Sequence, residues 1–431
     1  MIKTHILNKN NTYIPLASHG KKQGGINSTV EQTNNIAAYF EQYLTKESLF
    51  KDKRVLQSNH IPNNLLHREE QINTISKILA PTLRLERPSN LFIYGKTGTG
   101  KTVVTQAITE QIRSIAQKQN IPVKTFYLNC KLKKVADTEY RLIATLARFF
   151  NKNIPVTGLP TDEVYKILFD TIDEEEQLVI FILDEIDHLV HKTGDELIYN
   201  LTRINTELKK AQVSIIGISN DLSFANNLEP RVRSSLSEEE IIFPPYNALQ
   251  LQNILKERSQ KAFKEDTLTT GTIPKCAAYA AREHGDARRA IELLRVAGEL
   301  AEREEANQVT TQHIDKAEEK IEYERFIDLI RTQPKQHQAA LYSILTQKNN
   351  DAGTFTGDVY DHYWKVCTAT ALRPLTQRRV SDIIADLDMQ GLITAKVVSK
   401  GRFGRTREVG IAIPENIMPE IKTLLTTELG I

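Results

Sequence analysis

A glycine-rich stretch followed by a lysine and a threonine carries the strongest chemical signal in the chain. Residues 90–102 read NLFIYGKTGTGKT, an apolar β-prone run followed by Gly-x4-Gly-Lys-Thr, and a helical pattern continues to about residue 119. Glycines let backbone N–H groups turn toward the phosphates of a nucleotide, and the following helix points the positive end of its dipole at them. The predicted nucleotide-binding residues of this phosphate loop are Gly95, Gly98, Thr99, Gly100, Lys101 and Thr102.

An apolar strand that ends in two carboxylates supplies the second half of the predicted site. Residues 177–187 read QLVIFILDEID. In a site of this kind Lys101 brings a positive charge to the phosphates, Thr102 and Asp184 hold Mg²⁺, and Glu185 orients and polarises the attacking water. A solvated turn is the alternative for Asp-Glu after a strand, but the preceding phosphate loop favours the catalytic interpretation. The sequence therefore predicts ATP or ADP with Mg²⁺ as ligands.

Alternating strands and helices must position these residues. Short β-rich apolar runs lie at 90–94, 124–129, 178–183 and 213–219, with helical patterns between them. This alternation is typical of an α/β domain with a mostly parallel sheet. The pattern is helical from about 248 to 330, and the Gln333-Pro334 step then begins another unit. The predicted domains are a flexible tail at 1–57, the α/β core at 58–247, a helical domain at 248–332 and a C-terminal domain at 333–431.

The C-terminal domain reads as three helices followed by a β-hairpin, the pattern of a winged helix. The predicted helices span 335–346, about 357–371 and about 376–390. One face of the third helix has the spacing of a buried stripe; its residues are Val380, Ile383, Ile384 and Leu387. Arg378 and Arg379 lie off this stripe near the start of the helix, which suits the leading end of a recognition helix in a DNA major groove.

Positive charge concentrates in this domain although the whole chain is nearly neutral. The chain has 56 Lys+Arg and 54 Asp+Glu, a net charge of +2, whereas residues 370–407 hold eight Lys/Arg and three Asp, a net +5. Such a cluster suits contacts with DNA phosphates and limited reading of bases. Protein contacts or a merely solvated charge run are the alternatives. The predicted DNA-binding residues are Arg373, Arg378, Arg379, Lys400, Arg402, Arg405 and Arg407.

Composition excludes several other classes of protein. The 431 residues are 40% hydrophobic and 26% charged, which is ordinary for a globular protein. Apolar runs are too short for a membrane span of about 18 residues, and the N-terminus has no signal-peptide pattern. Cys130, Cys276 and Cys367 are too widely spaced for a disulfide scaffold or a simple zinc finger. We expect a cytoplasmic, nucleoid-associated protein without a membrane partner.

The phosphate loop and the Asp-Glu pair, together with other residues, resemble the AAA+ ATPases. Asn220 follows the strand at 213–219, where this family carries a polar residue, sensor 1, that touches the γ-phosphate and the water. Residues 229–235, EPRVRSS, look like the arginine-finger box. The resemblance implies that Arg231 or Arg233, with Arg231 favoured, stabilises charge on the nucleotide of a neighbouring subunit. A surface cation is the alternative.

In the helical domain, residues 285–291, GDARRAI, resemble the sensor 2 motif of the same family. Arg288 would then reach back to the phosphates and close a helical lid over the nucleotide, while Arg289 is expected to be solvated. Tyr246 and Arg258 match the family segment that borders the base or ribose, with a plain hinge as the alternative.

Three further features resemble the archaeal origin-recognition and cell-division-cycle-type initiators. Residues 61–72, IPNNLLHREEQI, look like the segment that covers the adenine, to which Ile61 and Arg68 would contribute. The helical stretch at about 138–150 lies where initiators insert a helix that contacts DNA. The order of ATPase core, lid and winged helix is also that of the initiators.

This resemblance implies an ATP-dependent replication initiator that binds double-stranded origin DNA. Such a protein takes part in helicase loading, with ATP binding and slow hydrolysis as a switch, and its partners are the replicative helicase or other initiator subunits. Two alternatives stay open. One is a nucleotide-locked DNA-binding regulator of transcription, and the other is a helper AAA+ ATPase of plasmid replication or transposition.

Overall fold

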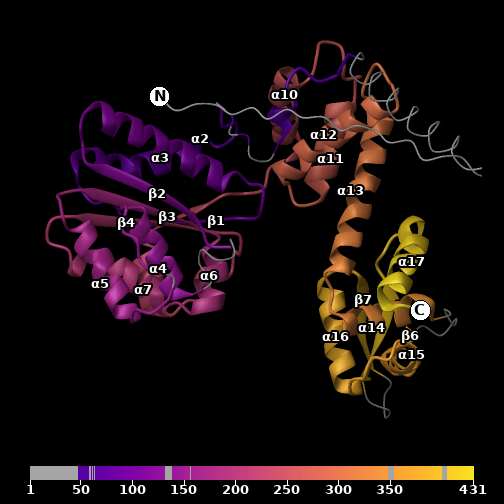
Figure 1. Ribbon diagram of the computed structural model, residues 1–431. Helices are drawn as coiled ribbons and strands as arrows, with labels where there is room; N and C mark the ends of the chain where they lie inside the picture. Colours follow the sequence, from indigo (N-terminus) through magenta and orange to yellow (C-terminus); the bar gives the residue numbers. More distant parts are fainter. Residues whose placement is uncertain are drawn as a thin grey trace, which may run out of the picture. The chain divides into compact units, whose positions relative to one another are not determined.

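A five-stranded parallel sheet forms the centre of the α/β core in the computed structural model (Figure 1). The structure describes residues 47–57, 60, 62, 64–131, 138–155, 157–347, 354–399 and 405–431. The strands are β1 (Leu91–Tyr94), β2 (Val123–Asn129), β3 (Leu178–Asp184), β4 (Gln212–Ser219) and β5 (Glu239–Ile242). Their order is β2-β3-β4-β1-β5. The four predicted strands and the α/β fold class are confirmed.

The edge strand β5 was not predicted from the sequence. It is short, and its two glutamates and Ile242 are exposed, so that only Ile241 is buried. Such a strand lacks the apolar run that marks the central strands. It pairs with β1 in parallel register and leads directly into the helical domain.

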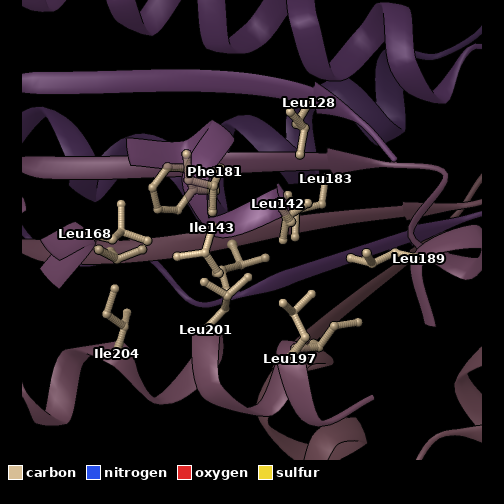
Figure 2. Close-up of a cluster of buried hydrophobic side chains, with 14 of the residues drawn as sticks. Leu128, Leu142, Ile143, Leu168, Phe181, Leu183, Leu189, Leu197, Leu201 and Ile204 are labelled. Carbon is tan, nitrogen blue, oxygen red and sulfur yellow. The ribbon is translucent and has the colours of Figure 1, made fainter. Parts of the chain in front are cut away.

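Helices cover both faces of the sheet (Figure 1). One face carries α2 (Glu69–Leu79) and α3 (Lys101–Lys118). The other carries α4 (Glu139–Arg148), α5 (Thr161–Ile172), α6 (Ile186–Thr193) and α7 (Glu196–Arg203). Figure 2 shows side chains of the second layer directed toward Phe181 and Leu183 of β3. Shorter elements of the core are η2 (Ala80–Arg84), η3 (Ile204–Thr206), α8 (Phe224–Asn227) and α9 (Pro230–Leu236).

Helix α4 is the stretch that was expected to be a DNA-contacting insertion. Its apolar face, including Leu142, Ile143 and Leu146, is fully buried in the core cluster. Thr138 caps its N-terminus by accepting a hydrogen bond from the Arg141 N–H. This face of the helix therefore has a packing role, and contact of the remaining face with DNA stays a prediction.

The helical domain, called the lid below, consists of α10 (Ala248–Ala262), α11 (Thr272–Arg282), α12 (Ala287–Arg303) and the first part of α13 (Thr311–Arg331). A capping box of Asn247 and Gln250 starts α10. Ala290, Leu293, Leu294 and Ala297 of α12 are fully buried, as the amphipathic pattern of a packed helix requires.

Part of the segment that was predicted to be a flexible tail packs into the lid instead. Phe50, Val55 and Leu56 are buried in the lid cluster, and η1 (Lys53–Leu56) forms a helical turn. The Phe50 and Phe263 rings lie 4.6 Å apart between centroids. The structure corrects the predicted tail in this part, because a few large apolar side chains outweighed a polar composition. Residues 1–46 lie outside the described residues.

The C-terminal domain has the helix order and the hairpin of a winged helix. Its helices are α14 (Lys335–Thr346), α15 (Thr356–Ala369), α16 (Gln377–Met389) and α17 (Met418–Leu429), with η5 (Glu415–Ile417) before the last. Its antiparallel strands are β6 (Thr354–Phe355), β7 (Ile393–Ser399) and β8 (Arg405–Ile411), in the order β6-β8-β7.

Helix α16 confirms the predicted buried stripe. Val380, Ile383, Ile384 and Leu387 are each at most 3% exposed. Helix α17 was not predicted, although Ile421, Leu425 and Leu429 repeat at the helical interval of four and are buried. Helix α13 joins two domains, since Ile314 and Ala317 pack in the lid and Ile327 and Ile330 pack with the winged helix. Among the described residues, no helix is long and apolar enough to span a membrane.

Candidate nucleotide site and winged-helix surface

The carboxyl ends of three adjacent strands bring the predicted nucleotide residues together. Strand β1 lies beside β4, and β4 lies beside β3. The phosphate loop follows β1, Asn220 follows β4, and Asp184 ends β3. Parallel strands place these ends at one edge of the sheet, which is where α/β proteins bind ligands.

Lys101 is held in the phosphate loop by acceptors from two segments. Its Nζ donates to the carbonyl oxygens of Gly95 at 2.7 Å and Lys96 at 2.8 Å, and to Asn220 Oδ1 at 2.9 Å. The residue is only 4% exposed. Burial lowers the pKa of Lys101 to about 8, with Asp184 opposing the shift and Arg288 adding to it. The structure therefore brings Lys101 and Asn220 into direct contact.

Two loop glycines accommodate close neighbours from other segments. Gly98 has a φ of +68°, and an added Cβ would overlap the Asp286 carboxylate of the lid. Gly100 has a φ of +93°, and an added Cβ would lie 2.9 Å from Tyr246 Oη. Glycine tolerates this left-handed backbone without strain. Larger residues would both strain the loop and displace these side chains.

Thr102 and Asp184 present oxygen atoms at one point, as a magnesium site requires. The Thr102 hydroxyl donates to Asp184 Oδ2 at 2.8 Å. Hydroxyl and carboxylate oxygens are ligands that Mg²⁺ accepts, usually together with waters and phosphate oxygens. The donor set therefore fits the predicted ion.

Tyr127 is a residue of this site that the sequence analysis did not assign. Its hydroxyl donates to the same Asp184 Oδ2 at 2.7 Å, and burial followed by the Asp184 charge raises its pKa well above the ordinary value. Tyr127 lies on β2 next to β3. The sequence does show a tyrosine near the end of one strand and a carboxylate, Asp184, at the end of another. It does not show that these two strands, β2 and β3, pair with each other.

Glu185 adopts a left-handed backbone conformation, with φ of 55° and ψ of 45°. Its Oε1 lies 3.5 Å from Asn129 Nδ2, while its Oε2 lies 3.5 Å from Lys131 Nζ and 3.7 Å from His188 Nε2. A non-glycine residue in this conformation is uncommon and is concentrated at functional sites. Asn129 and Lys131 were not assigned to the site from the sequence.

Arg68 and Arg258 are buried, and their guanidinium groups bind protein carbonyls. The Arg68 group donates to the carbonyls of Thr99, His67 and Pro244. Arg258 donates to the carbonyls of Val55 at 2.9 Å and His60 at 3.2 Å. Both side chains line the cavity described below, but these bonds make them structural supports of the site as well. Ile61 lies outside the described residues.

The lid contributes Arg288 to the site and Asp286 to its support. Asp286 Oδ1 accepts from the N–H groups of Arg288 at 2.7 Å and Arg289 at 3.3 Å, which caps α12. The Arg288 side chain lines the cavity. Arg289 was expected to be solvated, and this expectation is wrong because it pairs with Glu283 at 3.2 Å and Glu318 at 3.0 Å.

A cavity of about 910 Å³ lies between the phosphate loop and the lid. Most of the predicted nucleotide residues line it: Arg68, Gly98, Thr99, Gly100, Lys101, Thr102, Asp184, Glu185, Asn220, Tyr246, Arg258 and Arg288. Gly95 is not part of the lining, although its carbonyl binds Lys101. The structure therefore assembles residues from the phosphate loop, the end of β3, the position after β4 and the lid around one space.

Arg231 lies away from this cavity. Its side chain is 75% exposed and pairs with Glu229 at 3.2 Å. It therefore makes no contribution to the site of its own chain. An exposed position is the one that a residue acting on a neighbouring subunit needs, so the predicted arginine-finger role stays a prediction.

The predicted DNA-binding residues differ from one another in their surroundings. Arg373, Arg378 and Arg379 lie at the start of α16 or just before it, and Arg379 lies 3.6 Å from Asp382 with 69% of its side chain exposed. The Arg407 NH1 group donates to the Ser381 carbonyl of α16 at 2.9 Å, so this residue ties the β7–β8 hairpin, called the wing, to the predicted recognition helix. Lys400 and Arg402 lie outside the described residues, as does the Arg405 side chain.

Comparison with known protein families supports the identification of the α/β core, the lid and the winged helix. A family model described as an AAA domain matches residues 84–223. A model described as a Cdc6 AAA+ ATPase-type lid domain matches residues 252–319, and one described as a CDC6 C-terminal winged helix domain matches residues 328–420. The fold and the site thus define a protein of the AAA+ class with a helical lid and a C-terminal winged helix.

Relatives that align with most of this chain identify its family. The ORC1-type DNA replication protein of Pyrococcus furiosus is 54% identical over 379 residues, which cover 87% of this chain and 90% of the relative. The ORC1-type DNA replication protein 1 of Methanosarcina mazei is 48% identical over 89% of this chain and 92% of its own length. The chain belongs to the family of ORC1-type DNA replication proteins, which confirms the predicted resemblance and supports a replication initiator role.

A solved structure agrees with this assignment. The Aeropyrum pernix ORC1 protein in complex with DNA superposes with a TM-score of 0.79 at 40% identity, covering 89% of this chain and 98% of that chain. Cdc6p from Pyrobaculum aerophilum, at 20% identity and a TM-score of 0.55, shares the fold.

Proposed function

We propose that this protein is an ATP-dependent initiator that binds double-stranded origin DNA and helps to load the replicative helicase. The observation that carries the nucleotide part is the convergence of Lys101, Thr102, Asp184 and Asn220 at one edge of the sheet. The family supports the replication role, and the related ORC1 protein was solved with DNA. The lid over the same cavity supports a switch function for the nucleotide.

In the proposed mechanism, Thr102 and Asp184 would hold a Mg²⁺ ion, which would neutralise charge on the phosphates. Lys101 exchanges its carbonyl and Asn220 acceptors for phosphate oxygens. This exchange releases Asn220, whose amide then orients the water. Glu185 accepts the proton of that water. Tyr127 keeps the Asp184 carboxylate oriented through its hydrogen bond.

Charge on the transferred phosphoryl group requires cations from outside the phosphate loop. Arg288 provides one from the lid of the same chain, where it already lines the cavity. We propose that Arg231 provides another to a neighbouring subunit, which makes efficient hydrolysis depend on assembly. Tyr246 and Arg258 border the end of the cavity where the base and ribose of the nucleotide would lie.

The winged helix supplies the proposed DNA contacts. The leading end of α16 presents Arg378 and Arg379 to solvent, as a recognition helix in a major groove requires. Arg373 and the basic residues of the wing would contact phosphates beside it.

Genome-wide mapping of the DNA bound by this protein in its native cells tests the proposal. We expect peaks at replication start sites for the wild type, and loss of helicase recruitment at those sites for Lys101→Met. Peaks confined to promoters away from replication start sites would instead favour the transcriptional regulator.

A further inference from the structure

Arg68 connects three segments that meet beside the phosphate loop. It precedes α2, and its Nε donates to the Thr99 carbonyl of the phosphate loop at 2.9 Å. Its NH2 group donates to the Pro244 carbonyl at 2.6 Å, and NH1 donates to its neighbour His67 at 3.0 Å. Arg68 is only 2% exposed. A single buried cation thus ties the phosphate loop to the segment that follows β5.

Pro244 lies at the point where the chain leaves the core and enters the lid. Phe243 just before it belongs to the core, because its N–H donates to the Tyr94 carbonyl of β1. Tyr246 just after it belongs to the lid, because its side chain packs in the lid cluster and its N–H donates to the Gly285 carbonyl. The carbonyl that Arg68 binds therefore lies in the hinge.

Tyr246 gives Arg68 a second contact across the same junction. The Arg68 guanidinium lies 3.8 Å from the centroid of the Tyr246 ring, which is a cation–π contact with a lid residue. The Tyr246 hydroxyl also reaches the phosphate loop, since a Cβ added at Gly100 would lie 2.9 Å from it. The loop, Arg68 and the lid ring are thus in contact with one another.

The contacts of Arg68 depend on the orientation of the peptide group between Thr99 and Gly100. The Thr99 carbonyl belongs to the Thr99–Gly100 peptide, whose N–H is one of those that face the phosphates in a loop of this type. Binding phosphates orients that peptide and therefore its carbonyl. Because Arg68 is planar and holds several acceptors at once, a shift of one acceptor is passed to the others.

We propose that Arg68 is a positioning residue that couples the state of the phosphate loop to the hinge and lid through Pro244 and Tyr246. The proposal rests on nucleotide binding at this cavity. It gives Arg68 a role other than contact with the adenine. Removal of its guanidinium loosens the phosphate loop in the nucleotide-free protein and uncouples lid closure from nucleotide binding.

The test compares Arg68→Met and Arg68→Lys with the wild type in the full chain. Hydrogen exchange is measured at the amides of residues 98–102 and 246–251, without and with Mg²⁺-ADP, and ADP affinity is measured by calorimetry. Arg289→Met is the matched control, because Arg289 also carries a largely buried side chain but pairs with lid glutamates and does not line the cavity.

For Arg68→Met we expect faster exchange at residues 98–102 without nucleotide and loss of the ADP-dependent protection at residues 246–251. We expect ADP affinity to fall by about tenfold, the scale of one charged hydrogen bond. Arg68→Lys keeps the charge but not the planar set of donors, so it should show intermediate protection. It replaces Arg68→Met as the deciding variant if the latter does not fold.

A double-mutant cycle with Tyr246→Leu tests the coupling itself. If Arg68 and Tyr246 act together, the double variant loses only as much ADP affinity as the single variant with the larger loss. Multiplicative losses, or unchanged protection at residues 246–251 in Arg68→Lys and Arg68→Met, would overturn the proposal. Failure of the wild type to bind ADP would refute the proposed function instead, while exchange in the nucleotide-free protein would still test the contact between Arg68 and the phosphate loop.

Discussion

The cations of the nucleotide cavity and those of the winged helix occupy opposite environments. Lys101, Arg68 and Arg258 are 4%, 2% and 8% exposed, and each donates to protein oxygens. Arg378 and Arg379 are exposed at the start of α16. The first group is oriented by protein acceptors, whereas the second group is open to solvent.

This difference separates two kinds of recognition. Oriented, buried charges act at short range and stabilise one geometry, which suits phosphate chemistry. Exposed charges act over about 8–10 Å and are screened by salt, which suits a first contact with a DNA backbone. Among the predicted DNA-binding residues whose side chains the structure describes, Arg407 is an exception, because its bond to the Ser381 carbonyl makes it resemble the arginines of the cavity.

The largest effect is expected at the residue that completes the chemistry of the cavity. Glu185→Gln removes the proposed proton acceptor but keeps the size of the side chain. ATP hydrolysis should fall about 100-fold or more, while ATP affinity is retained. Single-turnover hydrolysis and calorimetric binding measure the two quantities. Equal loss of both would show that Glu185 supports binding rather than catalysis.

Removal of the buried lysine of the phosphate loop should weaken nucleotide binding itself. Lys101→Met is expected to lower ATP and ADP affinity by about 10- to 100-fold, because a charged hydrogen-bond donor to phosphate is removed. Lys96→Met is the control, since Lys96 is an exposed residue of the same loop. Similar losses in both variants would contradict the special role of the buried lysine.

The lowered pKa of Lys101 predicts a pH dependence of the cavity. In the nucleotide-free protein this lysine loses its proton near pH 8, and phosphate favours the protonated form. ADP affinity should therefore fall as the pH rises above 8, by at most about tenfold per pH unit. Calorimetry from about pH 7 to about pH 9.5, a range that spans the titration, measures this slope, and Lys101→Met should lack it.

The exposed arginines Arg378 and Arg379 should affect how strongly DNA affinity depends on salt concentration. The double variant Arg378→Ala, Arg379→Ala is expected to reduce the slope of log affinity for duplex DNA against log salt by about 1 for each phosphate that the protein no longer neutralises. Arg113→Ala, which removes an exposed arginine of α3, is the control and should leave the slope unchanged. An unaltered slope in the double variant would remove the start of α16 from the DNA surface.

Arg407→Gln should have the smallest effect of these substitutions. It tests the difference between the cations that bind protein oxygens and those that are exposed and proposed to contact DNA. It removes one hydrogen bond between wing and helix, so we expect the free energy of unfolding of the winged helix to fall by about 1 kcal/mol. The salt slope for DNA should change less than in the α16 double variant. Thermal unfolding and DNA titration measure these effects. A salt slope reduced as much as in the double variant would place Arg407 among the residues that bind phosphates directly.

Much of the candidate nucleotide site could be predicted because its residues lie in short, ordered motifs. Lys101 and Thr102 follow a strand within one motif, and Asp184 ends another strand, so local patterns were sufficient to place them. Tyr127 and Asn129 could not be assigned in the same way. Their roles depend on the pairing of β2 with β3, strands that are far apart in the sequence.

The sequence by itself determined the strand–helix alternation, the phosphate loop, the two carboxylates and the buried stripe of α16, because each is a periodic or contiguous pattern. Only the tertiary structure decided what the buried arginines do. Arg68, Arg258 and Arg289 have the same side chain, and local sequence does not state which carbonyl or carboxylate lies nearby. Burial of a cation is tolerated only where such partners converge, and in this protein most of those partners come from distant parts of the chain.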